Sequence, residues 1–101
     1  MAMQADVLAS KPATSTGQLK NQADENIGRA RIKSVYIVPT GTAGSVVFKD
    51  GGSGGSTIMT LNTVASATQP TWILVPDQGI LFRTNIHVTL TDVGSVMVFY
   101  G

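Results

Sequence analysis

The chain has 101 residues, which is enough for one domain with a single hydrophobic core. It contains no cysteine, so neither a disulfide nor a thiolate metal site can stabilise it. Charged residues make up only 13% of the chain, while hydrophobic residues make up 43%. In so small a domain, this composition favours an outer surface that is partly covered by partner subunits, as in a homo-oligomer. The alternative is a solitary chain whose surface is rich in Ser, Thr and Asn.

Two classes of partner are not supported by the sequence. The net charge is +1 and the seven basic residues are scattered, so no basic stripe is available for nucleic acid. The longest run of bulky apolar residues spans 72–75, far shorter than a membrane-spanning segment. Residues 1–10 also lack the basic start and apolar core of a secretory signal, so we expect a chain that is not exported through a cleavable signal.

Residues 1–28 are predicted to form an extended N-terminal arm. They are mainly polar, and their apolar residues are too sparse for a packed helix or strand. The side chains that could anchor the arm are Val7, Leu8, Leu19 and Ile27. Such an arm could become ordered along a neighbouring subunit, or it could be a frayed terminus without a role. Residues 29–101 are then the folded domain.

From residue 31 the pattern changes to the two-residue period of β-strands. The first strand is predicted over residues 31–38, and it ends at the turn residues 39–41. Both of its faces are apolar, with Ile32, Tyr36 and Val38 on one face and Val35 and Ile37 on the other. We therefore expect this strand to be covered on both sides.

Further strands are predicted over residues 45–49, 57–62, 71–75 and 80–82. The glycine-rich segment 50–56 is interpreted as a flexible hairpin tip, and residues 76–79 as a turn. The apolar strand over 71–75 is expected to be buried on both faces.

The last third of the chain carries the clearest alternation. In residues 85–91, Ile86, Val88 and Leu90 alternate with polar residues, as in a strand with one face on the core. A turn at 92–95 leads to a final strand over 96–100. Six or seven short strands without helical periodicity predict an all-β fold, namely an antiparallel β-sandwich or small barrel of the jelly-roll kind.

No constellation typical of an enzyme is found. His87 is the only histidine, and the six acidic residues lie mainly at predicted turns or in the arm. The glycine-rich run is not followed by the Gly-Lys-Ser/Thr sequence of a phosphate-binding loop. Asp50, Ser53 and Ser56 could approach a cation, but the acidic ligands of a calcium loop are missing, so a turn is preferred. We expect no catalytic residue, no metal and no cofactor.

Trp72 is the single tryptophan and lies inside the apolar strand over 71–75. We interpret it as a residue of the core or of a subunit interface. An exposed aromatic platform for a glycan remains a second interpretation, which would require Trp72 or Tyr36 to be exposed to solvent.

Several segments resemble small structural proteins encoded by tailed bacteriophages. The resemblance covers about residues 29–101 and is carried by the segments RIKSVYI (31–37), GSVVFKDG (44–51), GILF (79–82), VTLT (88–91) and VMVFYG (96–101). It implies a non-enzymatic virion component, made in the host cytoplasm and located on the capsid surface. A decoration or cement protein that contacts the major capsid protein is the first expectation. A tail or head-to-tail component, or a receptor- or glycan-binding β-module, is the alternative.

A cement protein adds many modest contacts across capsomer junctions, and repeated copies sum their binding. The residues that we expect at such interfaces are Val7, Leu8, Leu19, Ile27, Trp72 and Tyr100. If the arm serves the attachment alone, a chain without residues 2–28 should still fold and should attach more weakly.

Overall fold

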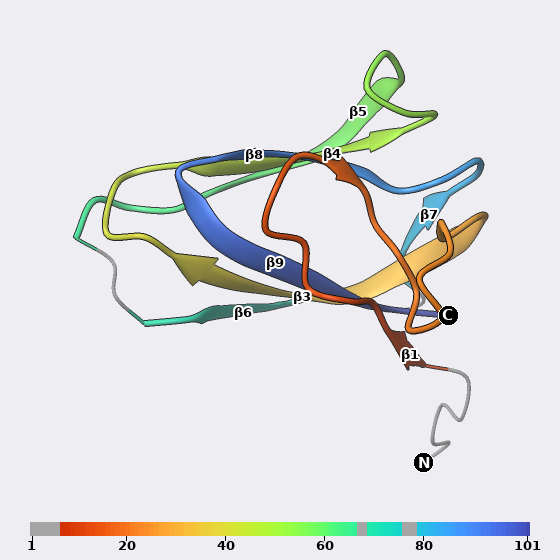
Figure 1. Ribbon diagram of the computed structural model, residues 1–101, viewed down its shortest axis with the longest axis horizontal. Coiled ribbons are helices and arrows are strands. Elements are labelled where there is room, and N and C mark those ends of the chain that lie inside the picture. The colour runs from red at the N-terminus through yellow and green to blue at the C-terminus, as the bar shows by residue number, and fades with distance from the viewer. Residues whose placement is uncertain (1–6, 67–68, 76–78) are drawn as a thin grey trace.

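A computed structural model of the chain describes residues 7–66, 69–75 and 79–101. The turn expected at 76–79 therefore lies mostly outside the described residues. All regular elements in the described part are strands (Figure 1), and their bounds are β1 Leu8–Ala9, β2 Gly17–Gln18, β3 Ala30–Pro39, β4 Ser45–Asp50, β5 Ser56–Asn62, β6 Thr71–Leu74, β7 Ile80–Phe82, β8 His87–Thr91 and β9 Val93–Tyr100.

The strands form two antiparallel sheets that pack as two layers. Sheet A has the order β1-β9-β3-β6, with β7 also paired to β3, and sheet B has the order β2-β8-β4-β5. The longest ladder joins β3 to β9, so the first long strand lies beside the last one (Figure 1). The predicted all-β sandwich is thus confirmed.

The connections follow a jelly-roll only in part. Strands β4 and β8 lie between β3 and β9 in the sequence, and the β4–β8 pair belongs to the sheet opposite the β3–β9 pair. A jelly-roll has this nested arrangement, because a long hairpin folds over to form both layers. The nesting then stops, because β5 returns beside β4 as a local hairpin and both β6 and β7 pair with β3.

The core lies between the two sheets and is built mainly from β-branched and aromatic side chains. Phe48 of sheet B and Phe82 of sheet A are both fully buried, and their rings meet edge to face with centroids 6.4 Å apart. They are surrounded by the other large buried side chains, which are Leu19, Ile32, Val35, Ile37, Val46, Ile86, Val88, Val96 and Val98. This cluster joins the two layers into one unit.

A β-bulge in β3 changes which side chains share a face. The register to β9 shifts between Ile32 and Ser34, so one additional residue is accommodated on β3. Ile32 therefore points into the core with Val35 and Ile37, whereas simple alternation placed it beside Tyr36. The expectation for Ile32 was wrong, because a two-residue period does not survive a bulge.

The N-terminal segment covers one lateral side of the sandwich. Strand β1 pairs with β9 at the edge of sheet A, and β2 pairs with β8 at the edge of sheet B. Between them, Ser10 is fully buried; its N–H donates to the Val98 carbonyl, and its Oγ accepts the Val98 N–H at 2.9 Å. The segment closes both edges that β8 and β9 would otherwise expose.

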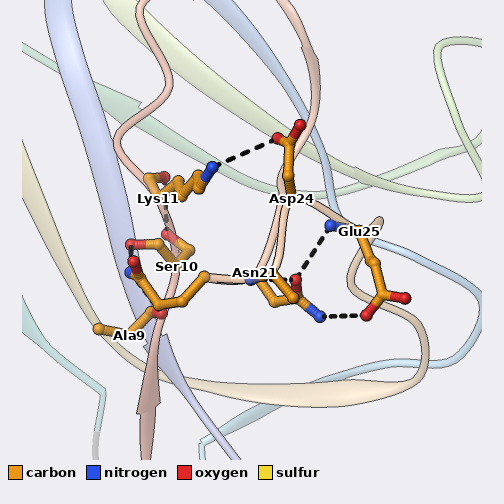
Figure 2. A network of polar contacts seen from close by, with 8 residues as sticks. Ala9, Ser10, Lys11, Asn21, Asp24 and Glu25 are labelled. Atoms are coloured by element: carbon orange, nitrogen blue, oxygen red, sulfur yellow. Dashed lines mark hydrogen bonds and ion pairs between the residues drawn. The ribbon is translucent and has the colours of Figure 1, made fainter.

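The return path from β2 to β3 is fixed by polar contacts (Figure 2). The Asn21 side-chain oxygen accepts the backbone N–H groups of Ala23 and Glu25, which forms a tight turn. Lys11 Nζ lies 3.6 Å from the Asp24 carboxylate across this turn. The turn brings Leu19 and Ile27 together over the core, where their exposed fractions are 1% and 4%.

The description of residues 1–28 as an arm outside the domain does not fit the packing of residues 7–28. Leu19 and Ile27 belong to the same core as the strands of the sandwich, so they are not available to a neighbouring subunit. Isolated apolar residues in a polar segment gave no periodic signal, and for that reason their burial was missed. We now expect deletion of residues 2–28 to unfold the domain, because it uncovers the core and two strand edges.

This can be tested with two leucines of the segment. Replacing Leu19 with Ala should lower the free energy of unfolding by about 2–5 kcal/mol, because it leaves a cavity in the core. Replacing Leu8 with Ala is the matched control, since Leu8 is 55% exposed, and it should change stability by less than about 0.5 kcal/mol. Urea unfolding followed by circular dichroism measures both. Equal stability of the two variants would contradict the assignment of this segment to the core.

Candidate interaction surface

The outer faces of the two sheets differ in chemistry. On sheet B, side chains of β4, β5 and β8 that alternate with core residues point away from the core. They are mostly hydroxyl, amide or charged groups, with Val47 and the 40% exposed Ile58 among them: Ser45, Val47, Lys49, Thr57, Ile58, Thr60, Asn62, Thr89 and Thr91. This face is of the kind that water solvates well.

The outer face of sheet A is apolar and aromatic. Cross-strand registers place Met97, Tyr36 and Trp72 in one row across β9, β3 and β6, and Phe99, Ser34 and Leu74 in the next row. Together with Val38 they form a surface that we call the aromatic face, which consists of Tyr36, Val38, Trp72, Leu74, Met97 and Phe99.

Ring contacts organise the aromatic face around Trp72. The Trp72 ring lies 5.0 Å from the Phe99 ring and meets the Tyr36 ring edge to face at 5.7 Å, measured between centroids. Ser34 lies between Leu74 and Phe99 in the register and is itself buried. Its small side chain leaves room for the Trp72 and Phe99 rings to meet above it. Even so, Trp72 remains 52% exposed and Leu74 73% exposed. The contacts within the chain leave much of this apolar surface open.

The exposure of β6 corrects one expectation. The strand over 71–75 was expected to be buried on both faces, but β6 is an edge strand whose outer face lies open. Only Ile73 and Val75 of this segment pack against the core. An uninterrupted apolar run is typical of a strand covered on both sides, and here the second cover is not supplied by the described part of the chain.

The residues that were expected at interfaces divide into two groups. Trp72, Val7 and Leu8 are exposed, the last two at the β1 edge of sheet A, so these three are accessible to a partner. Leu19, Ile27 and Tyr100 are buried inside the chain. Burial also raises the pKa of the Tyr100 hydroxyl.

Four residues of the aromatic face were not among those expected at an interface, namely Val38, Leu74, Met97 and Phe99. Phe99 carries the aromatic surface that was assigned to its neighbour Tyr100, because adjacent residues on a strand point to opposite faces. Met97 lies one row further along β9. Their alternation with the buried Val96, Val98 and Tyr100 was the signal that could have identified them.

Two hollows of the surface lie elsewhere. One is lined by residues 11–18 and Lys20, and the other by residues around Ile27 and Tyr100. Neither of these two hollows is lined by a residue of the aromatic face.

His87 is buried on strand β8. Its exposed fraction is 7%, and its Nδ1 atom has no hydrogen-bond partner among the residues that the structure describes. Across residues 7–66, 69–75 and 79–101, the structure contains no group of three or more His, Cys, Asp or Glu side chains that could hold a metal ion. We assign no chemistry to His87.

The glycine-rich hairpin tip is tied to the loop that precedes β8. The Asp50 carboxylate accepts the backbone N–H groups of Arg83, Thr84 and Asn85, and the Asn85 side-chain oxygen accepts those of Gly51 and Gly52. Gly51 and Gly52 have positive φ angles, which glycine adopts without strain. Hydrogen bonds therefore hold the tip against residues 83–85, and both carboxylate oxygens of Asp50 accept backbone N–H groups.

These contacts make stability depend on pH. Hydrogen bonds from the backbone of Arg83 and Thr84 lower the pKa of Asp50 below its ordinary value. The ionised carboxylate should therefore stabilise the fold fully above about pH 4 and lose this effect as the pH falls through the lowered pKa. Replacing Asp50 with Asn should lower stability at pH 7, and the difference from the original chain should shrink in acid.

Urea unfolding between pH 7 and pH 3 would measure this effect. Glu25→Gln is a suitable control, because Glu25 is an exposed carboxylate in the N-terminal segment. If the pH dependence of the Asp50 variant matched that of the original chain, the carboxylate would not contribute as described.

Comparison with known proteins adds no relative. Neither a family model, nor a curated protein, nor a solved structure matched this chain. A search of the described residues for a helix that is long and apolar enough to cross a membrane also found none.

Proposed function

We propose that this chain is a non-enzymatic structural protein of a tailed-phage virion, attached to its particle through the aromatic face. The observation that carries the proposal is the exposure of Trp72 and Leu74 beside Tyr36 and Phe99 on one face of sheet A. An apolar surface of this kind on a small domain is typical of a protein that is covered in its working state. The resemblance of residues 29–101 to small phage structural proteins supports the virion as the place.

The two outer faces suggest an orientation on the particle. The aromatic face would lie against the major capsid protein or another virion protein, and the hydroxyl-rich face of sheet B would face the solvent. Aromatic side chains surrounded by other contacts dominate the energy of many protein interfaces. Because virion proteins are present in many copies, a modest energy for each contact is sufficient for stable attachment. Capsid decoration is the first candidate role, and a tail or head-to-tail position is the second.

Immunogold electron microscopy would test the location. An antibody against the chain should label intact particles of a tailed phage whose genome encodes it, on the head for a decoration protein and on the tail for the second role. Particles that carry no label, with the chain found only in the soluble fraction of infected cells, would refute the proposal.

The contribution of the aromatic face to attachment can be measured by co-sedimentation with particles that lack the chain. Trp72→Lys should weaken attachment by at least about tenfold, which corresponds to about 1.4 kcal/mol, because a charge then replaces the central ring of the face. Thr60→Lys is the matched control, since Thr60 lies on the polar face of sheet B. Circular dichroism verifies that both variants fold. Equal attachment of the two variants would exclude the aromatic face.

A glycan-binding module remains a second candidate, because the partly exposed Trp72 packs against Tyr36 on the open face. Trp72 is the only tryptophan, so its fluorescence reports on this face alone. A concentration-dependent change of fluorescence with a glycan identified on an array, lost in Tyr36→Ala, would favour this role. The aliphatic side chains of Leu74 and Met97 beside the rings favour a protein partner.

A further inference from the structure

The edges of the two sheets differ in how well they are protected. At one side of the sandwich, β1 and β2 are edge strands of two residues each. At the other side, the edge strand β5 is interrupted by a bulge in its register to β4 between Phe48 and Lys49. Short, polar or bulged edges discourage pairing with another chain.

Two apolar strands remain at the edge of sheet A, and both pair with β3. Strand β7 has three residues, and none of them is exposed. Strand β6 has four residues, a regular register to β3 and an uncharged sequence, TWIL, in which three of the four residues are exposed. Among the edge strands that the structure describes, β6 therefore combines a regular register with two exposed large apolar side chains, Trp72 at 52% and Leu74 at 73%.

The backbone groups of β6 can be assigned to its two sides. The Val75 N–H donates to the Lys33 carbonyl at 3.0 Å, so these two residues form a hydrogen-bonded pair of the antiparallel ladder. Such pairs alternate with pairs whose backbone groups point outward. By this alternation, Ile73 and Thr71 use their backbone groups towards β3, whereas Trp72 and Leu74 direct theirs to the open edge.

We propose that β6 pairs with β6 of a second copy of this chain, in antiparallel orientation about a two-fold axis at Ile73. In this register Trp72 lies opposite Leu74 of the second copy, and the outward-facing N–H and C=O groups of both residues find partners. Ile73 faces its own equivalent. Sheet A then continues through the interface, and the two aromatic faces become one surface.

A second copy fits this edge for three reasons. The outward backbone groups lie symmetrically on either side of Ile73, so the strand is complementary to itself. No charged residue occurs in β6, so two copies do not repel each other there. The pairing also brings Trp72 and Leu74, which are 52% and 73% exposed in the single chain, against the same residues of the second copy. A four-residue edge is small compared with standard interfaces, so a weak dimer is expected in solution.

A single introduced cysteine can test the register, because the chain has no cysteine of its own. In the proposed dimer the two copies of residue 73 are directly opposite, at a Cβ separation of about 4.5–5.5 Å, which permits a disulfide after a small adjustment. Ile73→Cys should therefore form a covalent dimer under mild oxidation. Thr71→Cys is the control, because the two copies of residue 71 are then displaced by about four positions along the strands.

Oxidation at a series of protein concentrations, followed by non-reducing electrophoresis, gives the result. Fast covalent dimer formation by the Ile73→Cys variant and slow formation by the Thr71→Cys variant support the pairing. Similar rates for the two variants would reject it. Thermal unfolding under reducing conditions shows whether each variant is folded.

Sedimentation velocity of the purified protein tests the same interface without a new cysteine. The original chain should show a concentration-dependent dimer, and Leu74→Lys should weaken dimer formation by at least about tenfold, because it places like charges at the shared edge. Val64→Lys is matched in exposure, 71% against 73%, and lies in the loop after β5; it should leave the dimer intact. A monomer at every concentration would overturn the pairing, while attachment to particles, measured separately, would be unaffected by that result.

Discussion

The architecture depends on one constraint: strand β3 is apolar on both faces, and the described part of the chain covers only one of them. Sheet B covers the inner face, where Ile32, Val35 and Ile37 are fully buried. On the outer face, Tyr36 contacts Trp72, a ring from its own sheet. The cost of leaving such surface in water scales with its area, so the free chain retains a driving force for association. The proposed attachment would cover this outer face, whereas the proposed pairing would join two such faces into one larger surface.

The N-terminal segment protects one side of the sandwich. It pairs with β8 and β9, leaves edge strands of only two residues there, and buries Leu19 and Ile27 in the core, although Val7 and Leu8 stay exposed. The Asp50 turn fixes the loops at the end of sheet B. The aromatic face and its neighbouring edge carry two of the large exposed hydrophobic side chains, Trp72 and Leu74. Protected edges elsewhere limit the places where another protein can bind, and this favours specific binding at the aromatic face.

The sequence predicted the fold class well because alternation is strong in β4 and β9, where buried residues alternate with more exposed ones. It could not predict the bulge before Ser34, since a bulge depends on the partner strand. Phe99 and Tyr100 are different, because the alternation along β9 already places them on opposite faces and was not used to choose between them. Leu19 and Ile27 were missed for another reason. Their burial results from contacts distant in sequence, and no local pattern encodes such contacts.

The pairing of β9 also constrains how the chain can reach its folded state. Strand β9 lies between β1 and β3, so sheet A cannot be completed until residues 93–100 have left the ribosome (Figure 1). Pairings between such distant segments close large loops and slow the folding reaction. Until β9 has been synthesised, the apolar strand β3 lacks the strand with which it forms its longest ladder. Exposed apolar strands of this kind are prone to aggregation. We therefore expect the sandwich to fold as one cooperative unit that forms only after β9 has been synthesised.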